Sequence, residues 1–128
     1  MVSLDSSFLI DLLNGTRPAR DKARELNDSA EPRRLTAPVA AEVLLGGHRL
    51  GGAYQVRTEQ LINSLAQLPF DRASCHEAAK IAATAYSRGT PMREGDLFIA
   101  AITKRHGERL LTRDRVFGTV PGLQIETY

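Results

Sequence analysis

The chain has 128 residues, and its shares of hydrophobic residues (42%) and charged residues (25%) are close to those of globular domains. This length fits one domain with a sizeable core, and the composition excludes a disordered tail and a collagen-like chain. The single cysteine, Cys75, excludes an internal disulfide framework and a cysteine-based zinc site. We expect neither a secretion signal nor a membrane span, and therefore a cytoplasmic protein that makes no contact with a membrane.

The formal net charge is only +2, but the basic residues are mostly of one type. Arginine supplies most of the positive charge, and lysine occurs only at Lys22, Lys80 and Lys104. Arginine is the better residue for two-point contacts with phosphate. A basic surface around an acidic pocket would suit a polyanion held against a metal site. The charge count by itself is explained better by an ordinary solvated surface.

Short apolar runs alternate with longer helical patterns along residues 1–128, and no linker divides them, which predicts a single domain. In chain order we expect a strand at Val2–Asp5, helices at Phe8–Leu13 and Pro18–Ser29, a strand at Leu35–Ala37, helices at Pro38–Leu45 and Ala53–Leu68, a strand at Pro69–Asp71, helices at Ala73–Arg88 and Glu94–Lys104, and strands at Arg109–Thr112 and Leu123–Glu126.

Serines and glycines mark the expected helix ends. Ser6 and Ser7 are expected to cap the first helix, and Gly46-Gly47 to break the third. The stretch from Gly46 to Gly52 then reads as a flexible loop that contains His48.

Strands separated by helices require crossover connections, which predict a parallel sheet covered on both faces. The expected fold class is therefore α/β, with three layers. In such folds, ligands bind beyond the carboxyl ends of the strands.

Four acidic residues follow the expected strands. Asp5 ends the first strand, Glu42 lies one turn into the helix after the second, Asp96 lies in the first turn of the Glu94–Lys104 helix, and Asp114 follows the fourth strand. Capping, helix-dipole and turn roles would each explain one of the three aspartates. Glu42 is harder to explain, because its neighbours in the sequence are apolar. The sheet would bring all four together, and this explains the set better than four separate surface roles.

Clustered carboxylates repel one another and bind protons unless a cation enters. Hard oxygen ligands select Mg²⁺ or Mn²⁺ rather than zinc. Such an ion neutralises charge on a phosphate and activates water, so the set suits hydrolysis of a phosphodiester without a Ser, Cys or His nucleophile.

Four short segments then carry a family resemblance: Leu4–Ser7, Ala41–Val43, Gly95–Ala101, and Leu111–Asp114 with Phe117 after it. Their order and spacing resemble those of PIN-domain ribonucleases, and specifically of VapC-type toxins from toxin–antitoxin pairs. Each segment is weak by itself, but together they span almost the whole chain.

The resemblance implies a five-stranded sheet of order 3-2-1-4-5 and an endoribonuclease that depends on Mg²⁺ or Mn²⁺. It assigns catalytic roles to Asp5, Glu42, Asp96 and Asp114, with Asp5, Asp96 and Asp114 as metal ligands, and supporting roles to Thr112 and Ser6. It also implies a homodimer and inhibition by an antitoxin, with larger toxin–antitoxin assemblies as an extension.

Several other residues are candidates for RNA contact or for partner contact. Arg113, Arg115 and His48 are the expected RNA-binding residues, and Asp11 is interpreted as a solvated side chain. An antitoxin is expected to lay apolar residues between the first helix and the helices around Leu44-Leu45 and Leu61–Leu65, and to point a cationic side chain at the acids.

Two alternatives remain open from the sequence. One is a PIN-like module that binds RNA or protein without catalysis. The other is a receiver-type signalling domain, which the lack of an acidic pair after the first strand and of a lysine after the fourth makes less favoured.

Overall fold

A five-stranded parallel sheet lies at the centre of the computed structural model, which describes residues 1–128. The strands are β1 (Val2–Leu4), β2 (Arg33–Thr36), β3 (Ala66–Leu68), β4 (Arg109–Leu111) and β5 (Gln124–Glu126). The helices are α1 (Ser6–Leu13), α2 (Arg17–Ser29), α3 (Ala37–Leu50), α4 (Gly52–Asn63), α5 (Arg72–Ser87) and α6 (Glu94–Arg105), with a 3₁₀ helix, η1 (Arg115–Thr119), after β4.

The strand order is β3-β2-β1-β4-β5, as the resemblance implied, and every pairing is parallel. The central strand β1 pairs on both sides, with Val2 opposite Arg33 of β2 and opposite Arg109 of β4. All three residues of β1 are buried, which is typical of a strand covered on both faces. The predicted α/β class is confirmed.

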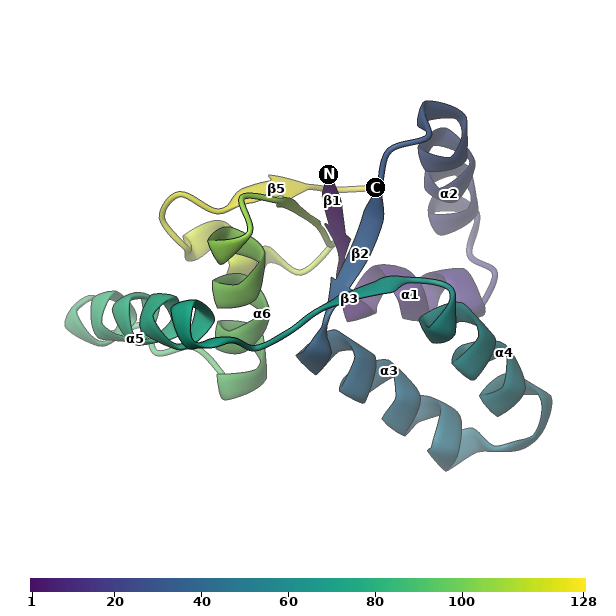
Figure 1. Ribbon diagram of the computed structural model, residues 1–128, viewed down its shortest axis with the longest axis horizontal. Coiled ribbons are helices and arrows are strands. Elements are labelled where there is room, and N and C mark those ends of the chain that lie inside the picture. The colour runs from purple at the N-terminus through teal and green to yellow at the C-terminus, as the bar shows by residue number, and fades with distance from the viewer.

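The helices form the outer layers of the fold. Figure 1 shows α1, α2 and α4 on one side of the strands and α5 with α6 on the other. Helix α3 packs against α4, and α5 against α6. The core between these layers includes Phe8, Leu9, Ile99, Leu111 and Phe117. No helix is long enough and apolar enough to cross a membrane.

The third helix does not break at its glycine pair as predicted. Helix α3 runs through Gly46 and Gly47 and ends at Leu50, and the next residue, Gly51, is its C-cap with a φ of +66°. Gly47 is buried, and a Cβ atom there would lie 3.0 Å from the Cβ of Thr58 on α4. The glycine therefore permits a close helix–helix approach instead of a turn. The predicted flexible loop is wrong, and His48 lies on α3.

The boundary between the fourth helix and the third strand was also predicted wrongly. Helix α4 ends at Asn63, and β3 is formed by residues 66–68 instead of by residues 69–71. Apolar residues continue across this boundary, so periodicity does not separate the helix from a short buried strand. Pro69 has no N–H group for a strand ladder, and Asp71 caps α5 by accepting a hydrogen bond from the Ser74 N–H at 2.8 Å.

The second strand begins earlier than predicted, and it ends where a cap is needed. Thr36 ends β2 and is the N-cap of α3, with its hydroxyl accepting from the Val39 N–H at 3.4 Å. Ala37 therefore belongs to the helix and not to the strand. This short turn brings the first residues of α3 to the carboxyl edge of the sheet.

Candidate active site

Asp5 lies at the carboxyl end of the central strand and is only 2% exposed. Its Oδ2 accepts hydrogen bonds from the Thr112 hydroxyl at 2.6 Å and from the Ser7 hydroxyl at 3.0 Å. Asp5 occupies the N-cap position of α1, yet its side chain makes no capping bond. Ser6 and Ser7 do not cap α1 as predicted, because both serines lie inside its first turn. The Asp5 carboxylate is thus held by hydroxyl groups and not by the helix.

Thr112 joins the ends of two strands. Its buried hydroxyl donates to Asp5 and accepts from the backbone N–H of Asp114 at 3.0 Å. The carboxylate of Asp114 accepts from the Val116 N–H at 3.1 Å, where it caps η1. One threonine therefore sets the positions of a carboxylate on β1 and of the backbone after β4.

Glu42, on α3, lies close to the other acids, as its pKa indicates. Partial burial is the main reason why the pKa of Glu42 is raised, and the charges of Asp5 and Asp96 raise it further. A hydrogen bond from Ser6 and the charge of Arg93 act in the opposite direction on this pKa but do not outweigh burial. Burial and two neighbouring negative charges therefore all disfavour the ionised form of Glu42.

Asp96, in the first turn of α6, completes the group. Burial is the first cause of its raised pKa, followed by the charge of Asp114, while Arg93 lowers the pKa and Asp5 raises it. Gly95 precedes Asp96, and a Cβ atom there would lie 3.2 Å from Glu42 Oε1. The missing side chain at residue 95 thus lets α6 approach Glu42. The fold brings the four predicted acids into one electrostatic cluster, although their chemical roles stay predictions.

The donors of this cluster are of the type that a divalent cation prefers. All four are carboxylates, which suit Mg²⁺ or Mn²⁺, and burial, followed by the charges of neighbouring acids, raises the pKa values of Glu42 and Asp96. In the side-chain arrangement of the structure, no three acidic, histidine or cysteine residues are close enough together to hold a metal ion. The donor set fits the ion by charge and by ligand type.

Two residues of the site were missed by the sequence analysis. Ser7 bonds to Asp5, and Arg93 is the cation whose charge acts on both Glu42 and Asp96. Arg93 is the N-cap residue of α6, three positions before Asp96. Residues three apart at a helix are neighbours, and this spacing could have identified Arg93 from the sequence. Nothing in the sequence distinguished Ser7 from Ser6 as the hydrogen-bond partner of Asp5.

Asp11 was predicted to be solvated, and this is wrong. Its side chain is only 14% exposed and accepts from Arg113 Nε at 2.7 Å, from Arg113 Nη2 at 3.2 Å and from the Tyr128 hydroxyl at 2.6 Å. The three residues come from α1, from the end of β4 and from the segment after β5, which only the sheet brings together.

The three predicted RNA-binding residues lie in different surroundings. Arg113 is paired with Asp11, Arg115 is exposed at the start of η1, and His48 is exposed on α3. The His48 ring lies 3.3 Å from Gln55 Nε2 and 3.8 Å from a carboxylate oxygen of Glu59, both on α4.

An apolar hollow of about 260 Å³ lies where a partner groove was predicted. Helices α1, α2 and α4 supply most of its lining, which includes Phe8, Leu12, Leu26, Leu61 and Leu65. Two walls of the predicted groove, α1 and the Leu61–Leu65 region, line this hollow, and α2 lines it where Leu44-Leu45 was expected. The groove for an antitoxin stays a prediction.

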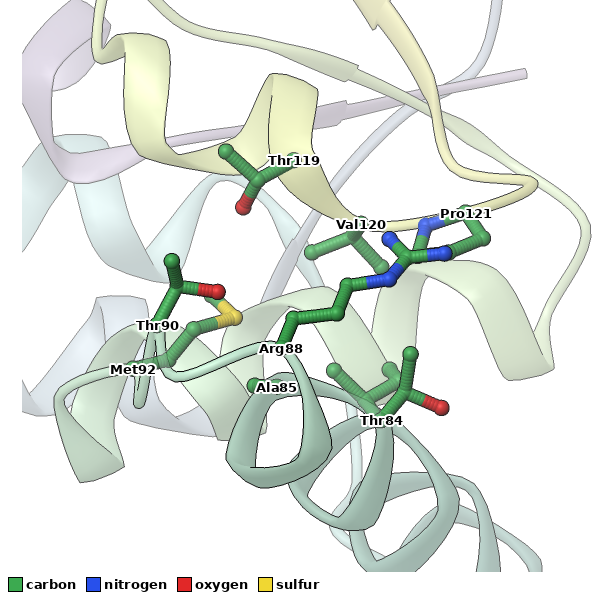
Figure 2. A pocket seen from close by; sticks show the side chains of 9 residues that line it. Thr84, Ala85, Arg88, Thr90, Met92, Thr119, Val120 and Pro121 are labelled. Atoms are coloured by element: carbon green, nitrogen blue, oxygen red, sulfur yellow. The ribbon is translucent and has the colours of Figure 1, made fainter.

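A second, much smaller hollow lies between the end of α5 and the segment after η1. Figure 2 shows the Arg88 side chain extending from the end of α5 towards Pro121, with Thr119 and Val120 nearby. Its volume of about 10 Å³ has room for roughly one water molecule, and none of the four acids lines it. This hollow is not the functional site.

Comparison with known proteins identifies the family to which this fold belongs. A model of the PIN domain matches residues 2–123. The chain belongs to the PIN-domain family. The predicted resemblance is thereby confirmed, and the receiver-type alternative is wrong, because receivers have the strand order 2-1-3-4-5.

The relatives of this PIN-domain chain include toxins and toxin–antitoxin complexes. Ribonuclease VapC11 of Mycobacterium tuberculosis is 31% identical over 124 residues, which are 94% of this chain and 91% of that protein. The crystal structure of FitAcB from Neisseria gonorrhoeae contains a chain that is 29% identical, with a TM-score of 0.81 and coverage of 98% of this chain and 96% of that one. A chain in the structure of VapBC2 from Rickettsia felis bound to a promoter DNA fragment is 16% identical, with a TM-score of 0.85. The match covers 100% of this chain and 99% of that one.

Proposed function

We propose that this PIN-domain protein is a metal-dependent endoribonuclease that hydrolyses RNA phosphodiester bonds and acts as the toxin of a toxin–antitoxin pair. The observation that carries the proposal is the cluster of four carboxylates from distant segments at the carboxyl edge of the sheet. The match to Ribonuclease VapC11 over nearly the full length of both chains supports RNA as the substrate.

In this proposal Asp5, Asp96 and Asp114 hold Mg²⁺ or Mn²⁺, and all four acids serve catalysis. When bound, the ion would supply positive charge against the phosphate and acidify water. Thr112 and Ser7 hold Asp5 in one orientation, so this carboxylate needs no rearrangement. The raised pKa of Glu42 suits it to take a proton from the attacking water, with Ser6 orienting its carboxylate.

The RNA would approach over the rim of the cluster. Arg113 and Arg115 flank Asp114 and are suited to contact phosphate, and His48 is a more distant candidate on α3. Arg93 adds positive charge beside Glu42 and Asp96.

The partner in this proposal is an antitoxin that fills the apolar hollow between α1, α2 and α4 and inserts a cationic side chain near Asp5, Glu42 and Asp96. The apolar contacts would supply most of the affinity, because a buried charge pair adds an uncertain net amount. Replacing the inserted cation by alanine is then expected to weaken inhibition more than binding. Inhibition by a partner bound far from all four acids would contradict this arrangement.

We also propose that the toxin is a homodimer, which places two sites on one assembly and extends the surface available to RNA. Sedimentation at micromolar concentration is expected to give about twice the chain mass of 14.0 kDa. A larger assembly is expected only with the antitoxin.

The deciding experiment is metal-dependent cleavage of RNA. The purified protein is freed of metal with a chelator and mixed with structured and single-stranded RNA, and Mg²⁺, Mn²⁺ or Ca²⁺ is then restored. We expect cleavage with Mg²⁺ or Mn²⁺ and none in the chelator alone. RNA binding without cleavage under every metal condition would instead favour the alternative of a PIN-like binding module. A metal-independent cut would contradict the four-carboxylate mechanism.

A further inference from the structure

A cluster of three polar residues, Asp11, Arg113 and Tyr128, lies directly beside the acidic site, and two of them, Asp11 and Tyr128, have no part in the chemistry described so far. Arg113 lies between Thr112 and Asp114, and its backbone N–H donates to the Ser7 hydroxyl at 3.4 Å. Its guanidinium donates to both carboxylate oxygens of Asp11, at 2.7 and 3.2 Å. The Tyr128 hydroxyl donates to the same Asp11 Oδ2 at 2.6 Å.

The geometry leaves one edge of this guanidinium free. Nε and one N–H of Nη2 point at Asp11, so the N–H groups of Nη1 and the second N–H of Nη2 have no partner within the cluster. These remaining groups form a planar fork of the kind that binds two phosphate oxygens. The Arg113 side chain is 61% exposed, so this free edge is open to solvent although the base of the guanidinium is held.

Asp11 is held in turn by residues whose positions come from packing. The Tyr128 ring lies edge-on against Phe8, with 5.0 Å between ring centroids, and Phe8 is buried in the core on the same helix as Asp11. The pKa of Asp11 is lowered, first by the hydrogen bond from Arg113, so the carboxylate stays ionised and keeps accepting from both partners. An arginine this exposed would otherwise sample many rotamers.

We propose that Arg113 binds a phosphate of the RNA substrate next to the scissile bond, and that Asp11 and Tyr128 are positioning residues that hold its guanidinium for this contact. The inference rests on the proposed ribonuclease function and adds to it a fixed phosphate-binding arm. Its physical basis is pre-organisation: a side chain that is already immobilised loses less entropy when the phosphate binds.

The test measures RNA binding separately from cleavage. In an Asp5→Asn background, the Kd of a short single-stranded RNA is measured by fluorescence anisotropy over a range of salt concentrations with Mn²⁺ present. Arg113→Ala is expected to raise the Kd by about 10- to 100-fold and to reduce the magnitude of the salt slope by about 0.7. Tyr128→Phe keeps the ring against Phe8 and loses only the hydroxyl, so it is expected to raise the Kd by about 2- to 10-fold.

A double-mutant comparison distinguishes positioning from general stability. If Tyr128 acts through Arg113, Tyr128→Phe changes the Kd in the parent background and does not change it further when Arg113 is already alanine. Asp11→Asn is expected to behave in the same way. Tyr86→Phe, which removes a hydroxyl from an exposed tyrosine on α5, is the matched control and is expected to leave the Kd unchanged.

The outcomes separate this inference from the proposed function. If the parent cleaves RNA and Arg113→Ala binds it as tightly as the background protein, the phosphate arm is overturned while the ribonuclease proposal stands. Equal effects of Tyr128→Phe with and without Arg113 would overturn the positioning role. A parent chain that neither binds nor cleaves RNA would overturn the ribonuclease proposal and this inference with it.

Discussion

At the scale of single residues, the site depends on how a buried carboxylate is held. Asp5 is almost fully buried, and its carboxylate accepts hydrogen bonds from two hydroxyl groups, those of Ser7 and Thr112. The neighbouring acids, Glu42 and Asp96, have raised pKa values and so oppose further negative charge. The free protein is therefore strained electrostatically at the place where the proposed cation and phosphate would bind.

The first prediction concerns this carboxylate. Asp5→Asn keeps the shape and one acceptor oxygen but removes a charge, and we expect RNA cleavage to fall by more than about 100-fold. The melting temperature of the metal-free variant is expected to equal or exceed that of the parent, because a repulsive charge has been removed. Cleavage by gel assay and melting by differential scanning calorimetry measure the two effects.

Asp28→Asn is the matched control, because Asp28 is an exposed acid on α2 that forms no ion pair. Parent-like cleavage is expected for it. Full activity of Asp5→Asn would remove Asp5 from the proposed metal ligands.

At the scale of secondary-structure elements, the contact between α3 and α4 helps to position α3, the helix that carries Glu42. Gly47 is buried against Thr58, whose hydroxyl donates to the Tyr54 carbonyl oxygen at 2.8 Å. Thr58 is fully buried, so it has little freedom to move aside. Gly46, one residue earlier on the same helix, has nothing within 4 Å of where a Cβ atom would lie.

The adjacent glycines predict opposite effects of the same substitution. Gly46→Ala is expected to raise the free energy of unfolding by about 0.5–1 kcal/mol, because alanine costs less backbone entropy in a helix. Gly47→Ala is expected to lower it by about 1–3 kcal/mol, because the new methyl group overpacks against Thr58. Urea denaturation of both variants measures the difference. Equal stabilisation by both would show that α3 and α4 can separate without cost.

At the scale of the whole molecule, charged pairs close the edge of the sheet opposite the acidic site. Arg109, at the start of β4, bonds to Glu31 before β2 and to Glu126 on β5, and Lys22 on α2 also bonds to Glu126 at 2.8 Å. The hydrogen bonds from Arg109 are the first cause that lowers the pKa of Glu31 to about 2, with the amino group of Met1 adding to them. These acids are paired with cations, whereas none of the four acids of the site forms an ion pair.

This edge predicts how stability depends on pH. Because the pKa of Glu31 is lower in the folded chain than its ordinary value of 4.5, its contribution to stability is complete above that value and is lost as pH falls towards 2. Glu31→Gln is expected to flatten the fall in the free energy of unfolding between about pH 5 and 2. Denaturant titrations at several pH values compare the two proteins. Parallel curves would exclude a special role for Glu31.

Much of the fold and the type of the site followed from local patterns in the sequence. The alternation of strands and helices predicts a parallel sheet, and Asp5, Glu42, Asp96 and Asp114 fall at strand ends or on the helices near them, where such folds bind ligands. These features depend on neighbours in the chain or on the general geometry of crossovers. The end of α3 did not follow, because a glycine that permits packing has the same sequence signal as a glycine that ends a helix. The end of α4 did not follow either, because apolar residues continue from the helix into β3.

Contacts between distant segments were decided by the tertiary structure alone. Arg113 and Tyr128 meet Asp11 across 102 and 117 residues of sequence, and each alone resembles an ordinary surface side chain. Arg93 joins the acidic cluster for the same reason, since the approach of α6 to α3 places it there. Residue type and strand order predict which chemistry is present, while side-chain partners depend on distances that exist only after the sheet has formed.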